Sequence, residues 1–301
     1  MVWLSGLLPY EQATRVFERI GHRTLPRATL CRQAAEHGER LKTYWEGQQA
    51  QVSPERVVLH PVDHRQPKGV SMDGWMVHIR GEGWKECKVG AVYDVVLEER
   101  TDPQTGDKVE RARASQISYT AILGEVARFA PALWALAVER RIPEACHSSV
   151  TADGAEWIWN LATDLFPDSI QIVDWYHADQ HLAQAAQALF PDHPDQASRW
   201  RKAMQQPLFA GQIWTIIQTL HQAGLSDHAH YFEQHQRRMQ YLEFQEDGLP
   251  IGSGSVESAC KQFQARLKGP GMRWSRPGAE RMLVVRAAVL SDSFDYLWRA
   301  A

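Results

Sequence analysis

The chain has 301 residues, of which 44% are hydrophobic and 23% are charged, so it can bury a large core as one large domain or two smaller ones. Its apolar runs are too short to cross a bilayer, and Met1 to Leu4 lacks the basic region and long apolar stretch of a signal peptide, which predicts a cytoplasmic protein with no membrane partner. The four cysteines form no C-x-x-C pair and therefore indicate neither a zinc ribbon nor a disulfide framework.

The formal net charge of −3 argues against a nucleic-acid partner, because contacts to phosphates need clustered Lys and Arg. The basic residues are nevertheless clustered. From Lys261 to Arg286 seven of them stand against one acid, Glu280, and the stretch from Arg15 to Arg40 is also basic. Two local basic surfaces fit a DNA-binding protein, although a solvated helix face gives the same pattern.

Two helices are predicted first in the chain, Tyr10 to Ile20 and Pro26 to Leu41, because Gly21 suits the end of one and Pro26 the first turn of the next. This pattern predicts a helix-turn-helix-like DNA-binding segment over residues 1–52. Arg27 and Arg32 could reach phosphates or base edges from the second helix. Paired helices with such a turn also occur in proteins that never contact DNA.

Three strands are predicted next. Residues 53–67 are rich in Pro and His and indicate a connector. Strands are predicted over Gly69 to Ile79, Glu86 to Val96 and near Arg113 to Tyr119, with a strong turn at Asp102 to Asp107.

Helices and strands alternate after this meander. The pattern predicts a helix from Ile122 to Arg140, a strand from Ser148 to Ala152, a helix from Glu156 to Leu165 and a strand from Ile170 to Trp175. The order β-β-β-α-β-α-β is that of the RNase H-like fold, an α/β fold with a mixed sheet flanked by helices. Residues 53–177 are accordingly predicted to form the first part of a catalytic core.

The remainder of the chain has helical periodicity and almost no strand signal. Residues 178–247, rich in Gln, His and Ala, predict an all-helical insertion. A glycine-containing loop from Gly248 to Gly254 ends it. Residues 248–301 are then predicted to be a helical part of the catalytic core that carries an essential Glu.

Three carboxylates are the candidate catalytic and metal-binding residues. Asp73 stands in the middle of a predicted buried strand, where a carboxylate is costly unless it is hydrogen-bonded or bound to a cation. Asp153 follows the strand that ends at Ala152, and ligands gather at such strand ends. Glu257 follows a glycine-containing loop, at the start of a helix that Ser255 could cap. Such residues could hold two divalent ions, Mg²⁺ or Mn²⁺.

Four motifs in this order resemble those of bacterial insertion-sequence transposases of the ISKra type, which are related to the Mutator-like transposases with a DDE active site. The motifs are Ser71-Met72-Asp73-Gly74-Trp75, Thr151-Ala152-Asp153-Gly154, Val173-Asp174-Trp175-Tyr176-His177 and Gly252-Ser253-Gly254-Ser255-Val256-Glu257-Ser258. The resemblance runs from about Gly69 to the C-terminus. It implies an RNase H-like fold, metal-dependent cleavage and strand transfer at the ends of an insertion sequence, and action as a homo-oligomer on DNA in the bacterial nucleoid.

The motif Asp174-x-x-His177 is similar to a signature that Mutator-like enzymes carry after the second catalytic Asp. That similarity suggests that His177 contacts DNA or orients an active-site group, with Asp174 supporting it from the same strand. In the alternative assignment Asp174, rather than Asp153, is the second metal ligand. Asp153 could also serve only as a cap of the helix that follows it.

The C-terminal basic residues are the further candidates for DNA contacts. Trp274 lies between two arginines and could stack on a splayed base, whereas the tryptophans of the predicted strands fit packing roles. The other members of this group are Lys261, Arg266, Lys268, Arg273 and Arg276. Two alternatives to an active transposase remain: a truncated, inactive DNA-binding remnant, and an RNase H-like nuclease with another substrate.

Overall fold

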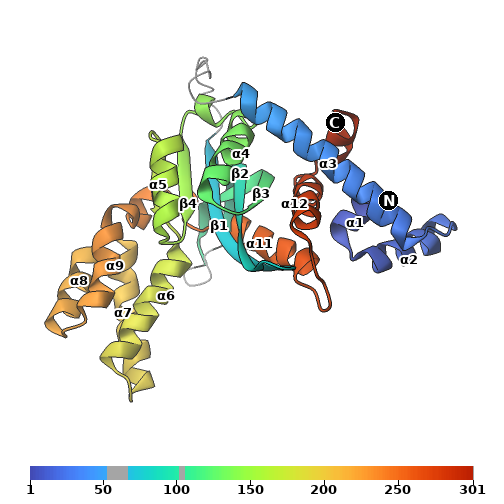
Figure 1. Cartoon of the computed structure of the whole chain (residues 1–301). Helices are drawn as coiled ribbons and strands as arrows, with labels where there is room; N and C mark the ends of the chain where they lie inside the picture. The colour runs from blue at the N-terminus through green and yellow to red at the C-terminus, as the bar shows by residue number, and fades with distance from the viewer. Residues whose placement is uncertain (53–66, 102–105, 301) are drawn as a thin grey trace.

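The computed structural model describes residues 1–52, 67–101 and 106–300 (Figure 1). The connector predicted at 53–67 lies almost entirely outside the described residues, as does most of the turn predicted at 102–107.

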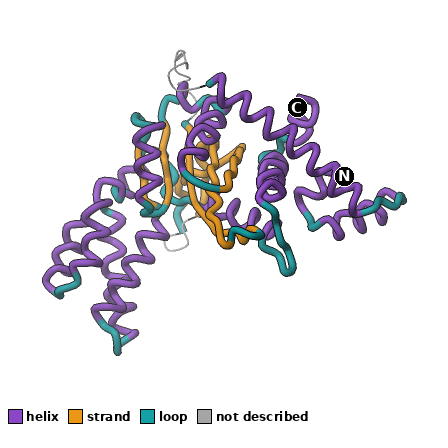
Figure 2. The backbone as a smooth tube through the Cα atoms, in the orientation of Figure 1, coloured by secondary structure: helices purple, strands orange, loops and turns teal. Residues whose placement is uncertain are grey.

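A five-stranded mixed sheet forms the centre of the molecule, as Figure 2 shows in orange. Its order is β3-β2-β1-β4-β5, with β1 antiparallel to β2, β2 antiparallel to β3, and β4 parallel to both β1 and β5. This arrangement confirms the predicted α/β class and is consistent with an RNase H-like fold. The strands are β1 (Lys68–Ile79), β2 (Gly83–Thr101), β3 (Lys108–Leu123), β4 (Ser148–Ala152) and β5 (Ile170–Val173).

Helices surround the sheet in the order in which the sequence predicts them. The N-terminal helices are α1 (Val2–Leu7), α2 (Tyr10–Gly21) and α3 (Arg27–Gln51), and those within the α/β part are α4 (Val126–Glu139) and α5 (Glu156–Leu165). The predicted insertion consists of α6 (Trp175–Leu189), α7 (Pro194–Phe209), α8 (Ile213–Gln222), α9 (Ser226–His235) and α10 (Tyr241–Glu246). The C-terminal helices are α11 (Gly254–Leu267), α12 (Arg276–Leu290) and α13 (Phe294–Ala300).

The two faces of the sheet are covered by different helices, because successive side chains of a strand point to opposite faces. On β1, Val70 and Met72 pack in the core formed with α4 and α5. Trp75, Val77 and Ile79 pack in a second core formed with α11 and α12. Side chains of a helix on the second face can therefore contact the residues at odd-numbered positions of β1.

The N-terminal helices lie on the opposite side of the sheet from the insertion (Figure 1). Helix α3 is longer than predicted, ending at Gln51 rather than Leu41, and its buried face includes Leu30, Ala34 and Leu41. It packs closely on α12, where a Cβ at Gly38 would stand 2.9 Å from the carbonyl oxygen of Arg281. The predicted helix pair is thus present. No helix in the described part of the chain combines the length and apolarity needed to cross a membrane.

Several predicted element ends are wrong, including both ends of β2, which runs from Gly83 to Thr101 instead of Glu86 to Val96. Strand β3 continues to Leu123, and α4 begins only at Val126, because Gly124 has a φ of 126° that ends the strand. Trp175 opens α6 instead of ending β5, because the Asp174 side chain caps that helix. Helix α11 begins at Gly254 with Ser253 at its N-cap position, so the predicted capping by Ser255 is wrong.

Candidate active site

Three aspartates lie on or directly after neighbouring strands of the sheet. Val70 of β1 pairs with Val150 of β4, and Asp73 and Asp153 each follow three residues beyond that pair. Ala152 pairs with Val173 of β5, so Asp153 and Asp174 directly follow the paired ends of β4 and β5. Asp73 lies within β1, which continues to Ile79, and the charge of Asp153 acts on it.

Glu257 reaches this edge from α11. The loop before that helix is fastened to the sheet, since Pro250 accepts a hydrogen bond from Thr151 Oγ1 at 3.1 Å and Ile251 accepts one from the backbone N–H of Trp175 at 2.9 Å. At the start of α11, Ser253 Oγ donates to Glu257 Oε1 at 3.3 Å. These bonds fix where the first turn of α11 begins, and with it the direction of the Glu257 side chain.

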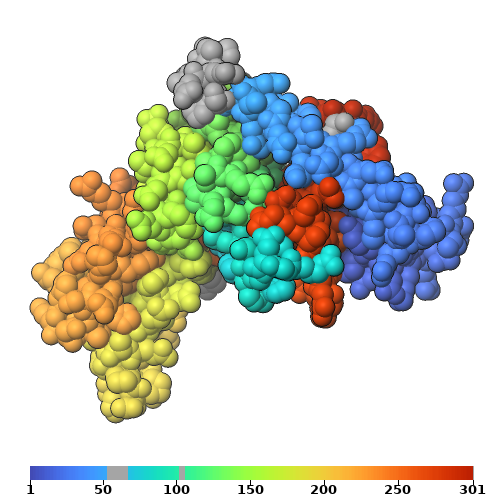
Figure 3. Space-filling model, viewed as in Figure 1, coloured from blue at the N-terminus to red at the C-terminus, as the bar shows by residue number. Residues whose placement is uncertain are grey.

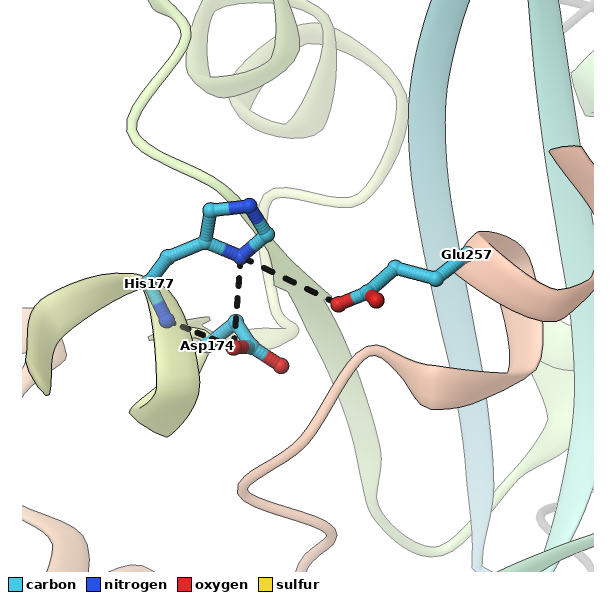
Figure 4. Close-up of side chains that lie close together, drawn as sticks. All are labelled: Asp174, His177 and Glu257. Atoms are coloured by element: carbon cyan, nitrogen blue, oxygen red, sulfur yellow. Dashed lines mark hydrogen bonds and ion pairs between the residues drawn. The ribbon is translucent and has the colours of Figure 1, made fainter. Parts of the chain in front are cut away.

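Asp174 is buried with 0% of its surface exposed and accepts hydrogen bonds on both oxygens, of which Figure 4 shows those from His177. Oδ1 accepts the backbone N–H of His177 at 2.9 Å and lies 3.2 Å from His177 Nδ1, and Oδ2 accepts the backbone N–H of Ser253. Burial acts to raise the pKa of Asp174, but these hydrogen bonds outweigh it and hold the pKa below its ordinary value. Asp174 is thus an ionised group that joins α6 to the loop before α11.

His177 stands between the carboxylates. Its Nδ1 lies 4.0 Å from Glu257 Oε1, in addition to its contact with Asp174 (Figure 4). The hydrogen bond to Asp174, followed by the charges of Asp174, Asp153 and Glu257, raises the pKa of His177 above its ordinary value, against the opposing effect of burial. Lys261 Nζ, which lies 4.0 Å from Glu257 Oε2, is a second basic group at the acidic edge. The prediction that Asp174 and His177 lie on a strand is wrong, because Asp174 is the cap and His177 the first turn of α6.

Asp73 and Asp153 influence each other electrostatically. Burial raises the pKa of Asp73, and the charge of Asp153 adds to this effect, whereas a hydrogen bond from Cys260 of α11 and the charge of His177 oppose it. Asp73 Oδ1 accepts the backbone N–H of Gly74 at 2.6 Å, and Asp153 Oδ1 accepts that of Ala155 at 2.9 Å. Asp153 therefore stabilises the start of α5, as the capping alternative expects, while its charge still acts on Asp73.

A metal ion could be held by Asp174, His177 and Glu257, whose nearest ligand atoms all lie within 4.8 Å of one another. All five functional side chains predicted from the four motifs gather at this edge of the sheet. They come from β1, the end of β4, the start of α6 and the first turn of α11.

The sequence did not indicate a group of buried hydroxyls that lies beneath the aspartates. The Tyr93 hydroxyl lies 3.1 Å from Ser71 Oγ, and burial raises the pKa of Tyr93 against the effect of this hydrogen bond. Its ring crosses β1 above Gly69, where a Cβ would stand only 2.1 Å from a ring carbon. The glycine inside a predicted strand was the available signal for this close approach.

The insertion supplies one wall of the site, which the sequence did not indicate either. The rings of His181 on α6 and Tyr231 on α9 stack with centroids 3.5 Å apart. Gly154, next to Asp153, lies against them, since a Cβ there would stand 2.6 Å from the Tyr231 ring. The insertion is therefore in contact with the segment that carries Asp153.

The predicted DNA-contacting residues divide into an exposed or partly exposed group and a buried pair. Arg27, Arg32, Lys261, Lys268 and Arg273 are exposed, and the partly exposed Arg276 pairs with Glu82 at 2.6 Å.

Two of the predicted DNA contacts are wrong. Arg266 is only 2% exposed and donates from Nε to the carbonyl of Ser5 at 2.7 Å. Trp274 is 9% exposed and donates from Nε1 to the carbonyl of Leu267 at 2.9 Å. Both side chains pack inside the C-terminal core, because α11 and the loop after it fold back onto β1.

The chain matches no known protein-family model, and comparison with curated proteins gives no match. The assignment of a function therefore depends on the residues of the site and their arrangement.

Proposed function

We propose that the chain is a DNA transposase that cleaves DNA at the ends of an insertion sequence and transfers the freed strand ends to target DNA in a divalent-metal-dependent reaction. The observation that carries the proposal is the placement of Asp73 on β1 and of Asp153 directly after its parallel neighbour β4, where the charge of Asp153 acts on Asp73. Glu257, in the first turn of α11, lies 4.0 Å from His177 at the same site. Carboxylates from separate elements that converge at strand ends are suited to binding hard cations.

Asp73, Asp153 and Glu257 are assigned as the ligands, and Asp174 as a positioning residue. Both oxygens of Asp174 already accept N–H groups and its side chain has no exposed surface, which suits a residue that positions its neighbours. Its oxygens keep further lone pairs, so Asp174 with His177 and Glu257 is the competing ligand set. Asp73 is a partly buried carboxylate with a raised pKa near a second acid, and a nearby cation would stabilise its ionised form. Mg²⁺ and Mn²⁺ fit this all-oxygen donor set.

Two bound ions would activate the attacking water or 3′-hydroxyl and stabilise the leaving oxygen. The residues of the chain supply the geometry. Asp174 holds His177 through its N–H and ring, and it holds the loop before α11 through Ser253, so one buried carboxylate sets two sides of the site. His177, with its raised pKa, is placed to donate a hydrogen bond to a phosphate oxygen of the DNA.

DNA is the proposed partner and the bacterial nucleoid the proposed place of action. Arg27 and Arg32 at the N-terminus offer charge for phosphate contacts, and Lys261 on the exposed side of α11 offers it next to the acidic edge, with its Nζ 4.0 Å from Glu257 Oε2. Cleavage at two ends of one element requires two sites, so we expect the chain to act as a homo-oligomer on paired ends.

The direct test is Mn²⁺-dependent nicking of a labelled duplex that carries the end of the insertion sequence. Asp73→Asn, Asp153→Asn and Glu257→Gln should each abolish cleavage. Asp174→Asn should retain part of it, with a loss of about 10–100-fold, as is typical when an outer-shell partner is removed. Asp164→Asn, at an exposed position of α5, is the matched control and should cleave like the unmodified chain.

The alternatives give different outcomes in the same assay. Salt-dependent binding of the duplex without any cleavage would identify a DNA-binding remnant. Cleavage of a branched junction in preference to the element end would identify a nuclease with another substrate. Loss of all cleavage in Asp174→Asn, together with activity in Asp153→Asn, would make Asp174 the second ligand.

A further inference from the structure

The β1–β2 hairpin extends beyond the rest of the sheet. Strand β4 pairs with β1 only at residues 68–70, whereas β1 continues to Ile79. At its far end the loop after α11 takes the place of a strand, since Ile79 bridges to Trp274 and the N–H of Arg80 donates to the carbonyl of Trp274 at 2.9 Å. We name residues 76–86 of this hairpin, together with the loop at residues 268–273, the hairpin arm. Figure 3 shows its cyan hairpin residues beside the red residues of the C-terminal loop.

An exposed tryptophan lies on the hairpin arm. Trp84 leaves 59% of its surface exposed, with the His78 ring packed edge-on at 5.6 Å and Lys268 Nζ 5.5 Å from the ring centre. An indole between an imidazole and an ammonium group can stack on a nucleobase while the cation contacts the phosphate beside it. This is the combination that the sequence pattern assigned to Trp274, whose ring is buried.

The hairpin arm carries an excess of positive charge. Its two acids are neutralised, Glu82 by Arg276 at 2.6 Å and Glu86 by the buried Lys88. The exposed or partly exposed cations that remain are Arg80, Lys85, Lys268 and Arg273. This positive charge complements the phosphate backbone of a nucleic acid.

The hairpin arm continues the strand that carries Asp73. His78 is five residues beyond Asp73, which corresponds to roughly 17 Å at the rise of an extended chain. His78 and its cross-strand partner Trp84 occupy even-numbered positions and therefore lie on the face of the sheet opposite Asp73. A duplex advances about 3.4 Å for each base pair, so DNA that passes from Asp73 along β1 to the tip of the hairpin would reach the hairpin arm within a few nucleotides.

We propose that the hairpin arm binds the DNA next to the cleaved phosphate, with Trp84 stacked on an unpaired base and Lys268 on the adjoining phosphate. The proposal rests on the proposed transposase function and names the strand-holding surface for it. The ligand is a nucleic acid with at least one base free of its partner, because only an unstacked base offers its face to an indole.

The test measures binding alone, in EDTA, so that no cleavage occurs. Labelled duplexes with and without a short single-stranded overhang are titrated with the full chain and with Trp84→Ala and Trp84→Phe. Trp84→Ala should weaken binding to the overhang duplex by between about five-fold and a hundred-fold, and binding to the blunt duplex by less than about two-fold. Trp84→Phe should recover most of the loss.

The matched control is Trp214→Ala. Trp214 lies on α8 of the insertion and is 60% exposed, so it tests whether any exposed tryptophan gives the same effect. Lys268→Ala should weaken binding to both duplexes and reduce its salt dependence, whereas Lys202→Ala, at an exposed position of α7, should change neither. Heparin should displace DNA from the unmodified chain and bind equally to Trp84→Ala.

Three outcomes would overturn the proposal. They are an equal loss on blunt and overhang duplexes, equal effects of Trp84→Ala and Trp214→Ala, and a change in the oligomeric state of Trp84→Ala, which would make the hairpin arm a protein interface. If one of these occurs while Glu257-dependent cleavage persists, only the role of the hairpin arm fails. Failure of the proposed function would instead appear as the absence of cleavage in the unmodified chain.

Discussion

Asp174 shows how a single buried carboxylate can hold the site together. Its oxygens accept the N–H groups of His177 and Ser253, which belong to α6 and to the loop before α11. Asp174→Asn keeps the shape but turns an NH₂ group towards an N–H donor. We expect the free energy of unfolding to fall by about 2–4 kcal/mol, measured by urea denaturation at pH 7. Asp168→Asn, at an exposed position, should change it by less than about 0.5 kcal/mol.

The same substitution should have a defined pH dependence. The folded protein holds the pKa of Asp174 below that of the unfolded chain, against the opposing effect of burial. The ionised group therefore stabilises the fold at pH values above the unfolded pKa, about 3.9, and this contribution is lost as the pH falls through the folded value. The stability difference between the unmodified chain and Asp174→Asn should consequently narrow below about pH 4. A difference that stays constant down to pH 3 would contradict the role of the charge.

The chemical type of each site residue could be predicted from the sequence, but its exposure could not. Asp73, Asp153 and Glu257 stand out because carboxylates in apolar or glycine-containing surroundings need a partner. Trp274 and Arg266 had an equally suggestive pattern, yet both are buried, because the loop after α11 turns back along β1. The sequence around Trp84 did not distinguish it from the other tryptophans, although it lies on an exposed basic surface. Local sequence does not show which side of a turn meets the core.

At the scale of elements, two glycines of α3 should respond in opposite ways to the same substitution. Gly38 lies against the backbone of α12, where a Cβ would stand 2.9 Å from the Arg281 carbonyl oxygen, whereas nothing lies within 4 Å of a Cβ at Gly47. Gly38→Ala should force the helices apart and lower the free energy of unfolding by about 1–3 kcal/mol. Gly47→Ala should raise it by about 0.5–1 kcal/mol, because alanine favours the helix.

Thermal or urea unfolding of the two variants measures this contrast, and each serves as the control for the other. Similar destabilisation by both substitutions would mean that the close contact between α3 and α12 is not present in solution. Similar stabilisation by both would lead to the same conclusion, because only the helix propensity of alanine would then be acting.

The elements themselves were predictable where the pattern was strong. Strand β4 and helix α5 have the predicted bounds, Ser148–Ala152 and Glu156–Leu165. The errors occur where a side chain or a glycine overrides the periodicity, as at Gly124 after β3 and at the Asp174 cap before α6. A hydrophobic pattern does not itself mark where a helix or strand ends, because the end is set by a capping residue or a glycine. Periodicity alone could not locate these ends.

At the scale of the whole molecule, the spatial order of the strands made the site, and the sequence did not contain that order in any local form. Asp153 and Asp174 compete for one role on sequence grounds, because Asp153 follows one predicted strand and Asp174 lies near the end of the next. In the structure both directly follow paired strands, and the hydrogen bond that Asp174 accepts from Ser253, a segment 79 residues later, distinguishes the two. A long-range contact of this kind lies beyond single-sequence reasoning.

Metal binding should couple the site to the stability of the whole chain. Carboxylates from β1, the end of β4 and α11 lie at one edge, and burial with the charge of Asp153 raises the pKa of Asp73. A divalent ion that binds only the folded chain adds about 2.7 kcal/mol at a hundred-fold excess over its dissociation constant. We expect Mn²⁺ to raise the unfolding temperature by roughly 5 °C and EDTA to reverse the change.

Variants identify which residues bind the ion. Asp73→Asn should abolish the Mn²⁺-induced rise and, in EDTA, should itself raise the unfolding temperature, because it removes a buried charge whose pKa burial raises. Asp164→Asn should leave the response to Mn²⁺ unchanged. The cluster of Asp174, His177 and Glu257 offers the competing site. If His177→Gln removes the rise while Asp73→Asn and Asp153→Asn retain it, the ion binds at that cluster, and the assignment of Asp73 and Asp153 as ligands is wrong.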